Sequence, residues 1–124
     1  DWREHFASGT ADVITCNPPY MKVGAGFKNP DDCKAAARHE LFVNFEEIAK
    51  NAAALLKFGG YFYAVHRADR LCDVLYYLRL NALEPKRLCF VSPSPEHPAN
   101  LILVEAMRGA KPSLKIEKPI YANI

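Results

Sequence analysis

One stretch decides the fold of this chain: Asp12-Val13-Ile14-Thr15-Cys16-Asn17-Pro18-Pro19-Tyr20. Its first half is rich in β-branched residues, which favours a buried strand over residues 12–16. The two prolines supply no backbone N–H, so the strand cannot continue beyond Asn17. Because a proline also restricts the residue before it to extended conformations, the strand should end in a stiff loop. In open α/β sheets, ligands bind at this end of the strands.

The composition indicates a small domain with one modest core. The chain has 124 residues, half of them apolar, and a formal net charge of +2, which neither requires nor excludes a nucleic-acid partner. It contains no stretch typical of a membrane span or a signal peptide. The four cysteines are widely spaced, which indicates reduced thiols in a cytoplasmic protein and argues against a zinc site.

The loop and helix that follow the motif are predicted from composition and periodicity. Residues 21–32 contain two glycines, two lysines and a proline, and they predict a loop that either closes over a substrate or is ordinary surface. From Cys33 or Arg38 to Lys57, apolar side chains recur on one helical stripe, and Gly59-Gly60 is a helix-ending signal. Tyr61–Val65 is typical of a central parallel strand covered on both faces.

The remaining elements complete an α/β pattern. After a polar break, in which Asp69 is a candidate helix cap, a second amphipathic helix should run to about Asn81. Pro85 opens the next segment, and two apolar strands then flank the proline-rich loop 92–98, so they should pair antiparallel. These strands are Leu88–Val91 and Leu101–Val104, the second extended to Met107. The order predicts the second half of a doubly wound sheet that ends in an antiparallel hairpin.

This order, with Asn-Pro-Pro-Tyr at the end of its first strand, resembles the carboxyl-terminal half of class I, Rossmann-like methyltransferases that depend on S-adenosylmethionine. More narrowly, the chain is similar to the tRNA1(Val) adenine-N6 methyltransferases of the small-domain type. The resemblance runs over nearly the whole chain. Besides the motif, it rests on Ala37-Arg38-His39-Glu40, Gly59-Gly60, His66-Arg67, Arg70-Leu71, Leu83-Glu84-Pro85-Lys86-Arg87 and Ala99-Asn100.

The resemblance implies transfer of a methyl group from S-adenosylmethionine to N6 of an adenine beside the anticodon of a tRNA. By position, Asn17, Pro18, Pro19 and Tyr20 form the target-amine site. The Asn17 side-chain oxygen and the Pro18 carbonyl would each accept one N–H of the target amine, which frees its lone pair for attack. Tyr20 offers a flat face on which the base can stack. The same residues also fit a proline-stiffened turn with a packed tyrosine.

The cofactor site implied by the resemblance is incomplete. Asp1 matches the acidic residue that contacts the cofactor's adenine, and Asn17 is the second candidate for cofactor binding. The glycine-rich loop of the family is absent, and Gly24-Ala25-Gly26 cannot replace it because no strand directly precedes it. We therefore expect residues 1–124 to be a partial methyltransferase domain that is inactive alone. Its uncovered sheet edge and apolar surface would also allow it to self-associate.

Six basic side chains are candidates for substrate binding. Two lie on the predicted loop, two begin the first helix and two follow the central strand, where they can contact RNA phosphates or simply be surface charge. They are Lys22, Lys28, Arg38, His39, Arg67 and Arg70.

Two other functions remain open from the sequence. The amide of a protein glutamine has the same chemistry as the adenine amine, so the motif alone also fits a protein-glutamine N5 methyltransferase. A non-catalytic RNA-binding or assembly module that keeps the fold without the cofactor is the second alternative. Neither is excluded by the residues of the motif.

Overall fold

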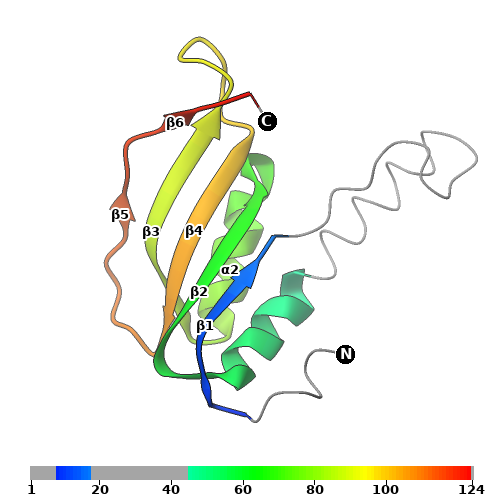
Figure 1. Cartoon of the computed structure of the whole chain (residues 1–124), viewed down its shortest axis with the longest axis vertical. Helices are drawn as coiled ribbons and strands as arrows, with labels where there is room; N and C mark the ends of the chain where they lie inside the picture. The colour runs from blue at the N-terminus through cyan, green and yellow to red at the C-terminus, as the bar shows by residue number, and fades with distance from the viewer. Residues whose placement is uncertain (1–7, 18–44, 124) are drawn as a thin grey trace, which may run out of the picture.

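A computed structural model describes residues 8–17 and 45–123 of the chain. Within these ranges, one six-stranded sheet has the order β1-β2-β4-β3-β5, and β6 also pairs with β3 (Figure 1). Residues 45–55 are helical. The other elements are β1 (Ala11–Cys16), β2 (Leu56–Arg67), η2 (Ala68–Arg70), α2 (Leu71–Leu80), β3 (Leu83–Ser92), β4 (Leu101–Arg108), β5 (Lys115–Ile116) and β6 (Ile120–Tyr121).

The strand pairing confirms the predicted fold class. β1 and β2 run parallel, with Cys16 opposite Ala64. β4 lies antiparallel to both β2 and β3, so β3 and β4 form the expected hairpin around the loop at 93–100. Two parallel strands connected through a helix, followed by a hairpin, are the second half of a doubly wound sheet.

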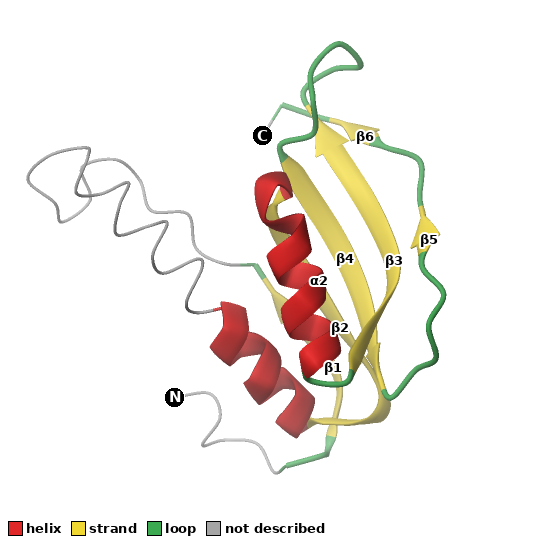
Figure 2. Cartoon of the chain, turned by 180° about the vertical axis from the view of Figure 1, so that it is seen from behind, coloured by secondary structure: helices red, strands yellow, loops and turns green. Residues whose placement is uncertain are grey.

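The described helices, 45–55 and α2, lie on the same face of the sheet, as both views show (Figure 2). Between them and the sheet lies a core of fully buried side chains, because apolar residues alternate along β2 and β4 and recur on one side of each helix. The largest of these side chains are Phe62, Leu56, Leu78, Leu83, Ile102 and Val74.

The predicted end of the first helix is wrong by two residues, because the helix stops at residue 55 and β2 begins at Leu56. Gly59-Gly60 therefore lies inside β2. Here the register between β1 and β2 jumps from Ala11 opposite Leu56 to Val13 opposite Tyr61. Gly59 has a φ of +82°, and a Cβ on Gly60 would lie 2.9 Å from the Lys57 carbonyl oxygen. The glycines thus allow an irregular strand entry and do not cap the helix.

Three further sequence predictions need correction. Tyr61–Val65 alternates between buried and half-buried side chains, so the described residues cover only one face of this strand. Asp69 is not a helix cap, since α2 follows Arg70 and has no side-chain cap. β3 begins at Leu83, before Pro85, and the proline is accommodated because it lies at a register shift.

The carboxyl-terminal segment runs along the outer edge of β3. Its two short strands, β5 and β6, are parallel to β3 (Figure 1). The Glu117 N–H donates to the Leu88 carbonyl at 2.8 Å, and the Ala122 N–H donates to the Ser92 carbonyl at 2.9 Å. The sequence showed only a weak alternation here, because two-residue strands are too short for a period to be recognised. No helix in the described part of the chain is long and apolar enough to cross a membrane.

Candidate functional site

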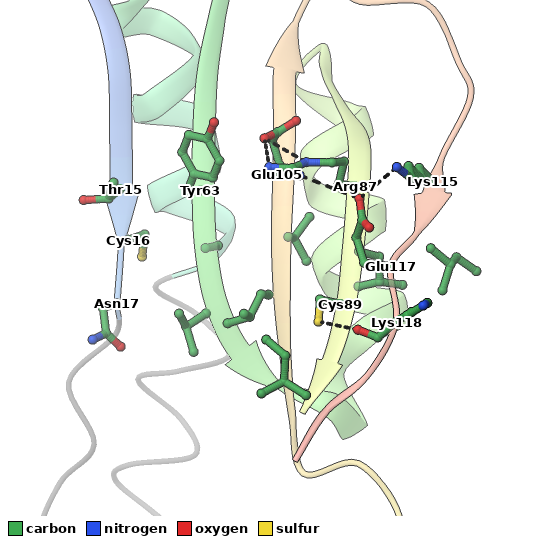
Figure 3. Close-up of a pocket in the computed structure, with 17 residues that line it drawn as sticks. Thr15, Cys16, Asn17, Tyr63, Arg87, Cys89, Glu105, Lys115, Glu117 and Lys118 are labelled. Carbon is green, nitrogen blue, oxygen red and sulfur yellow. Dashed lines mark hydrogen bonds and ion pairs between the residues drawn. The ribbon is translucent and has the colours of Figure 1, made fainter. Parts of the chain in front are cut away.

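Asn17 follows directly after β1 and is exposed. Since β1 is parallel to β2, this residue lies at the edge where the carboxyl ends of both strands meet. It lines an open cavity of about 940 Å³ on the sheet face opposite the helices. Figure 3 shows its amide group at the end of β1, beside the other side chains of the cavity wall. An exposed amide at a parallel strand end can accept and donate hydrogen bonds to a ligand in that cavity.

The cavity wall has an apolar part and a polar row. β2, β4 and β3 contribute Val65, Leu103 and Cys89, and the carboxyl-terminal segment adds Ile116 and Ile120. The polar row comes from successive register partners across the sheet: Thr15 with Tyr63, Tyr63 with Glu105, Glu105 with Arg87, and Arg87 with Lys115. Figure 3 shows Tyr63, Glu105, Arg87 and Lys115 at one level across the strands.

The polar row is held together by charge-assisted hydrogen bonds. The Arg87 Nε and Nη2 atoms donate to one carboxylate oxygen of Glu105 at 3.1 and 2.9 Å. A further carboxylate, Glu117, lies 3.6 Å from both Arg87 and Lys115. The hydrogen bond to Glu105 raises the pKa of the Tyr63 hydroxyl above its ordinary value. The charges at the row are therefore balanced, because Arg87 and Lys115 face the carboxylates of Glu105 and Glu117.

Sequence reasoning did not single out Tyr63, Glu105 or Arg87 as residues that share one surface. In the sequence, Arg87 belongs only to the stretch Leu83-Glu84-Pro85-Lys86-Arg87 on which the family resemblance rests. The available signal was the alternation of polar and apolar residues along β2 and β4, which places every second side chain on the face away from the helices. The pairing register, which brings these three residues to the same level, is a long-range property.

Cys16, the neighbour of Asn17, is a packed thiol. It contacts the helix-side core together with Ile14. Burial raises its pKa from 9.0 to about 11. At neutral pH the thiol is therefore protonated, and the thiolate is the form that reacts as a nucleophile. Cys16 is therefore a small packing residue of β1.

We expect Cys16 to be alkylated by iodoacetamide at pH 8 much more slowly than the exposed Cys72. The reason is that both the raised pKa and the burial of Cys16 lower the concentration of accessible thiolate. Mass spectrometry of the labelled peptides over time measures both rates in the same sample. Labelling of Cys16 should accelerate as the pH approaches 11. Equal rates for the two thiols at pH 8 would contradict the packing of the half-buried Cys16 against the core.

His66 is a buried residue near the end of β2, on the helix side of the sheet. Its Nδ1 atom accepts the Arg67 N–H at 2.9 Å, and its ring lies edge-on to Phe45 with 5.3 Å between centroids. Because Nδ1 is an acceptor, the ring proton is on Nε2. These contacts fix the end of β2 against the first helix.

Arg67 and Arg70, two of the predicted substrate-binding residues, each pair with a nearby carboxylate. Arg67 lies 2.5 Å from Asp69, and Arg70 lies 3.4 Å from Asp73. Both arginine side chains are 35% exposed. Arg67 ends β2 and Arg70 follows it, on the same edge as Asn17, and the charge of each arginine is offset by the carboxylate beside it.

The other predicted site residues lie outside the described ranges. They are Asp1, Pro18, Pro19, Tyr20, Lys22, Lys28, Arg38 and His39. Among the residues that are described, no group of histidine, cysteine, aspartate and glutamate side chains is arranged to hold a metal ion.

Solved structures with the same fold are methyltransferases by their descriptions. A predicted O-methyltransferase from Agrobacterium tumefaciens superposes with a TM-score of 0.65 over 92% of this chain and 44% of its own, at 18% identity. This chain has a methyltransferase fold. A putative DNA modification methylase from Thermus thermophilus, solved in complex with S-adenosyl-L-methionine, gives a TM-score of 0.55 over 91% of this chain and 54% of its own, at 16% identity.

Curated proteins extend the similarity to sequence. A tRNA1(Val) (adenine(37)-N6)-methyltransferase from Parabacteroides distasonis is 30% identical in an alignment of 119 residues that covers 90% of this chain and 49% of that protein. One of the same name from Phocaeicola vulgatus is 41% identical over 66 residues, 52% of this chain and 27% of that protein. No protein-family model matches. The resemblance indicated by the motifs is confirmed, and the chain spans about half the length of the first of these methyltransferases.

Proposed function

We propose that this chain is the carboxyl-terminal part of an N-methyltransferase that uses S-adenosylmethionine and acts on adenine N6 in a tRNA. The observation that carries the proposal is the position of Asn17, which opens Asn-Pro-Pro-Tyr at the carboxyl end of a parallel strand and lines a cavity. The two curated relatives named as tRNA adenine-N6 methyltransferases support the choice of substrate.

The chemistry of an exocyclic amine explains why an amide and a proline suit this position. The lone pair of the adenine amino nitrogen is delocalised into the ring, so the nitrogen is a poor nucleophile. In our proposal the Asn17 side-chain oxygen accepts one N–H and the Pro18 carbonyl accepts the other, which aligns the lone pair for attack. Tyr20 stacks on the base. Orientation and electrostatics are sufficient, and no strong general base is needed.

The cofactor supplies the methyl group when it is bound, and the residues of this chain fit only one side of its site. Asn17 is exposed at the open end of β1 and can face a ligand there. Asp1 is proposed as a second contact. The family's glycine-rich loop, whose backbone N–H groups would complete the site, is absent from the sequence. We therefore propose that residues 1–124 bind S-adenosylmethionine weakly or not at all without the rest of the protein.

The basic residues Lys22, Lys28, Arg38 and His39 remain our candidates for contacts with RNA phosphates. Arg67 and Arg70 can join them only if a phosphate competes with the carboxylates that now pair with them. Such exchange is feasible because exposed ion pairs contribute only about 0–1 kcal/mol. With a tRNA substrate, we also propose a cytoplasmic location for the protein. We further propose that the isolated chain self-associates through its uncovered surface.

Calorimetry followed by a transfer assay tests this proposal. S-adenosylmethionine is titrated into the 124-residue chain and into the whole protein, the longer polypeptide that we propose contains it. We expect binding by the whole protein alone, and transfer of tritium from the labelled cofactor to unmodified tRNA.

Each other outcome selects an alternative. Label in a glutamine-containing protein, with none in tRNA, would make the enzyme a protein-glutamine methyltransferase. Binding of the cofactor by neither polypeptide would favour the non-catalytic RNA-binding module and would overturn the proposed activity.

A further inference from the structure

The carboxyl-terminal segment, residues 111–123, combines a fixed backbone with exposed side chains. Its strands β5 and β6 pair with β3, and two side chains of β3 hold the backbone between and before them. Lys86 Nζ donates to the Lys111 carbonyl at 2.8 Å, and the Cys89 thiol donates to the Lys118 carbonyl at 3.3 Å. All but two residues of the segment are exposed. It is therefore a fixed strip of accessible side chains along one edge of the sheet (Figure 1).

The charge that this segment presents to solvent is positive. Its charged residues are three exposed lysines, Lys111, Lys115 and Lys118, and one glutamate. That glutamate, Glu117, is only 30% exposed, whereas the side chain of Lys115, 3.6 Å from it, is 74% exposed. Within the described ranges, no carboxylate forms an ion pair with Lys111 or Lys118. Figure 3 shows the Lys118 carbonyl turned toward Cys89 and the Lys118 side chain directed away from β3.

A tyrosine lies at the end of the segment that reaches the edge of Asn17. Tyr121 is 51% exposed and is opposite Ser92, the last residue of β3. β2 and β3 are both antiparallel to β4, so the carboxyl ends of β1, β2 and β3 lie at one edge of the sheet. Between β1 and β6 there are four strand spacings, or roughly 20 Å. Tyr121 is thus at the same edge as Asn17 but well outside the reach of a single base.

We propose that the carboxyl-terminal segment binds the RNA that surrounds the methylated adenine. Lys111 and Lys118 contact phosphates, and Tyr121 stacks on an unpaired base. The inference rests on the proposed function and assigns a part of its substrate that Asn17 and the cavity do not contact. An enzyme that acts on one base takes that base out of its stack, so the neighbouring nucleotides lie on the protein surface beside the site. Exposed lysines bind phosphates, and exposed aromatic side chains stack on bases of single-stranded loops.

The surface of the segment favours RNA over a protein partner. Exposed Ile116 lies between Lys115 and Glu117, so charge interrupts the apolar surface, which lacks the continuous patch of a protein contact site. A second copy of the chain would bring two sets of lysines together, and like charges in contact oppose association. Pro119, which supplies no backbone N–H, also separates β5 from β6 and limits edge-to-edge pairing.

The salt dependence of RNA binding tests the two lysines. An unmodified tRNA transcript is titrated into the whole protein by filter binding at several salt concentrations. Lys111→Ala and Lys118→Ala should each weaken binding and lower the slope of log affinity against log salt by about 1, because each removes one phosphate contact. Lys50→Ala is the matched control, since Lys50 is exposed on the helix at residues 45–55. Its affinity and slope should be those of the unmodified protein.

The stacking role of Tyr121 has a different signature. Tyr121→Ala should weaken tRNA binding by about fivefold or more without changing the salt slope, because a base–aromatic contact is lost and no phosphate contact is. Tyr121→Phe keeps the aromatic face and should restore the affinity. Tyr76→Ala removes a tyrosine on α2 that is 61% exposed, and it should leave binding unchanged. Circular dichroism at increasing temperature shows that each variant is folded.

Three results would overturn this inference. The first is an unchanged affinity and salt slope in Lys111→Ala and Lys118→Ala. The second is an equal loss of affinity in Lys50→Ala, which would make the effect one of total charge. The third is absence of tRNA binding by the whole protein. Methyl transfer is measured separately and decides the proposed function: binding through this segment without transfer would reject that function alone, and transfer with unaffected variants would reject this inference alone.

Discussion

Replacing Asn17 with alanine in the whole protein should reduce methyl transfer to tRNA by at least about 10²–10³-fold, which is the effect of removing one well-placed polar group from an active site. The alanine cannot accept an N–H of the adenine amine, so the lone pair stays in conjugation with the ring. Binding of tRNA should remain largely intact, because a single amide adds little to the contacts with phosphates. Tritium transfer and filter binding measure the two quantities.

A neighbouring substitution provides the control. Thr15 lies two positions earlier on the exposed side of β1 and also lines the cavity, but it belongs to the polar row across the sheet. Thr15→Ala should therefore keep most of the activity. Undiminished turnover in Asn17→Ala would reject the role that we propose for this amide. A parallel loss of tRNA binding would make it a binding residue.

The second large effect concerns stability. Phe62 is fully buried in β2 and packs against Phe45 with 6.4 Å between ring centroids. Phe62→Ala should lower the free energy of unfolding by about 3–5 kcal/mol, because the transfer free energy of the ring is lost and a cavity remains. Since a domain of this size is stabilised by only about 5–15 kcal/mol in total, the variant should be close to unfolding. Urea denaturation followed by circular dichroism measures the change.

Phe58 is the matched control for this substitution. It lies on the same strand, but 76% of its surface is exposed, and its main partner is the Arg108 guanidinium 5.4 Å above the ring. Phe58→Ala should lower the free energy of unfolding by about 1 kcal/mol or less. Similar losses of unfolding free energy for the Phe62→Ala and Phe58→Ala variants would show that the core does not centre on Phe62.

The sequence predicted the elements whose signals are local. β1 is recognisable because two prolines end a β-branched run, and α2 because apolar residues recur on one side and Asn81 follows it. The hairpin of β3 and β4 follows from the prolines in the short loop between them. Each of these depends only on residues within the element or directly beside it.

The errors arose where a local signal has two physical meanings. A Gly-Gly pair after an amphipathic stretch is a common helix end, but Gly59 and Gly60 instead allow an irregular strand entry beside β1. Similarly, the aromatic residues of Tyr61–Val65 indicated burial on both faces. Tyr61 and Tyr63 in fact stack on each other on the uncovered side, with 6.2 Å between ring centroids.

The candidate site was predictable in part. Asn17 could be found because its motif is contiguous in sequence. The rest of the cavity wall could not, because Tyr63, Glu105 and Arg87 come from three strands and meet only through the pairing register. The motif residues Asn17, Pro18, Pro19 and Tyr20 are consecutive and can be recognised from the sequence. The cavity wall is defined only by the pairing of strands that lie far apart in the sequence.

The carboxyl-terminal segment also determines how chains of this kind can aggregate. β5 and β6 occupy the outer edge of β3 in two short pieces, so among the described strands that edge offers no long ladder to another molecule. The opposite edge of the sheet is β1, where Val13 is 54% exposed. Among the described strands, β1 is therefore the edge that offers the longer ladder to a second chain, whereas β5 and β6 interrupt the ladder along β3. We expect edge-to-edge pairing to favour pairs of molecules joined through β1 over longer assemblies.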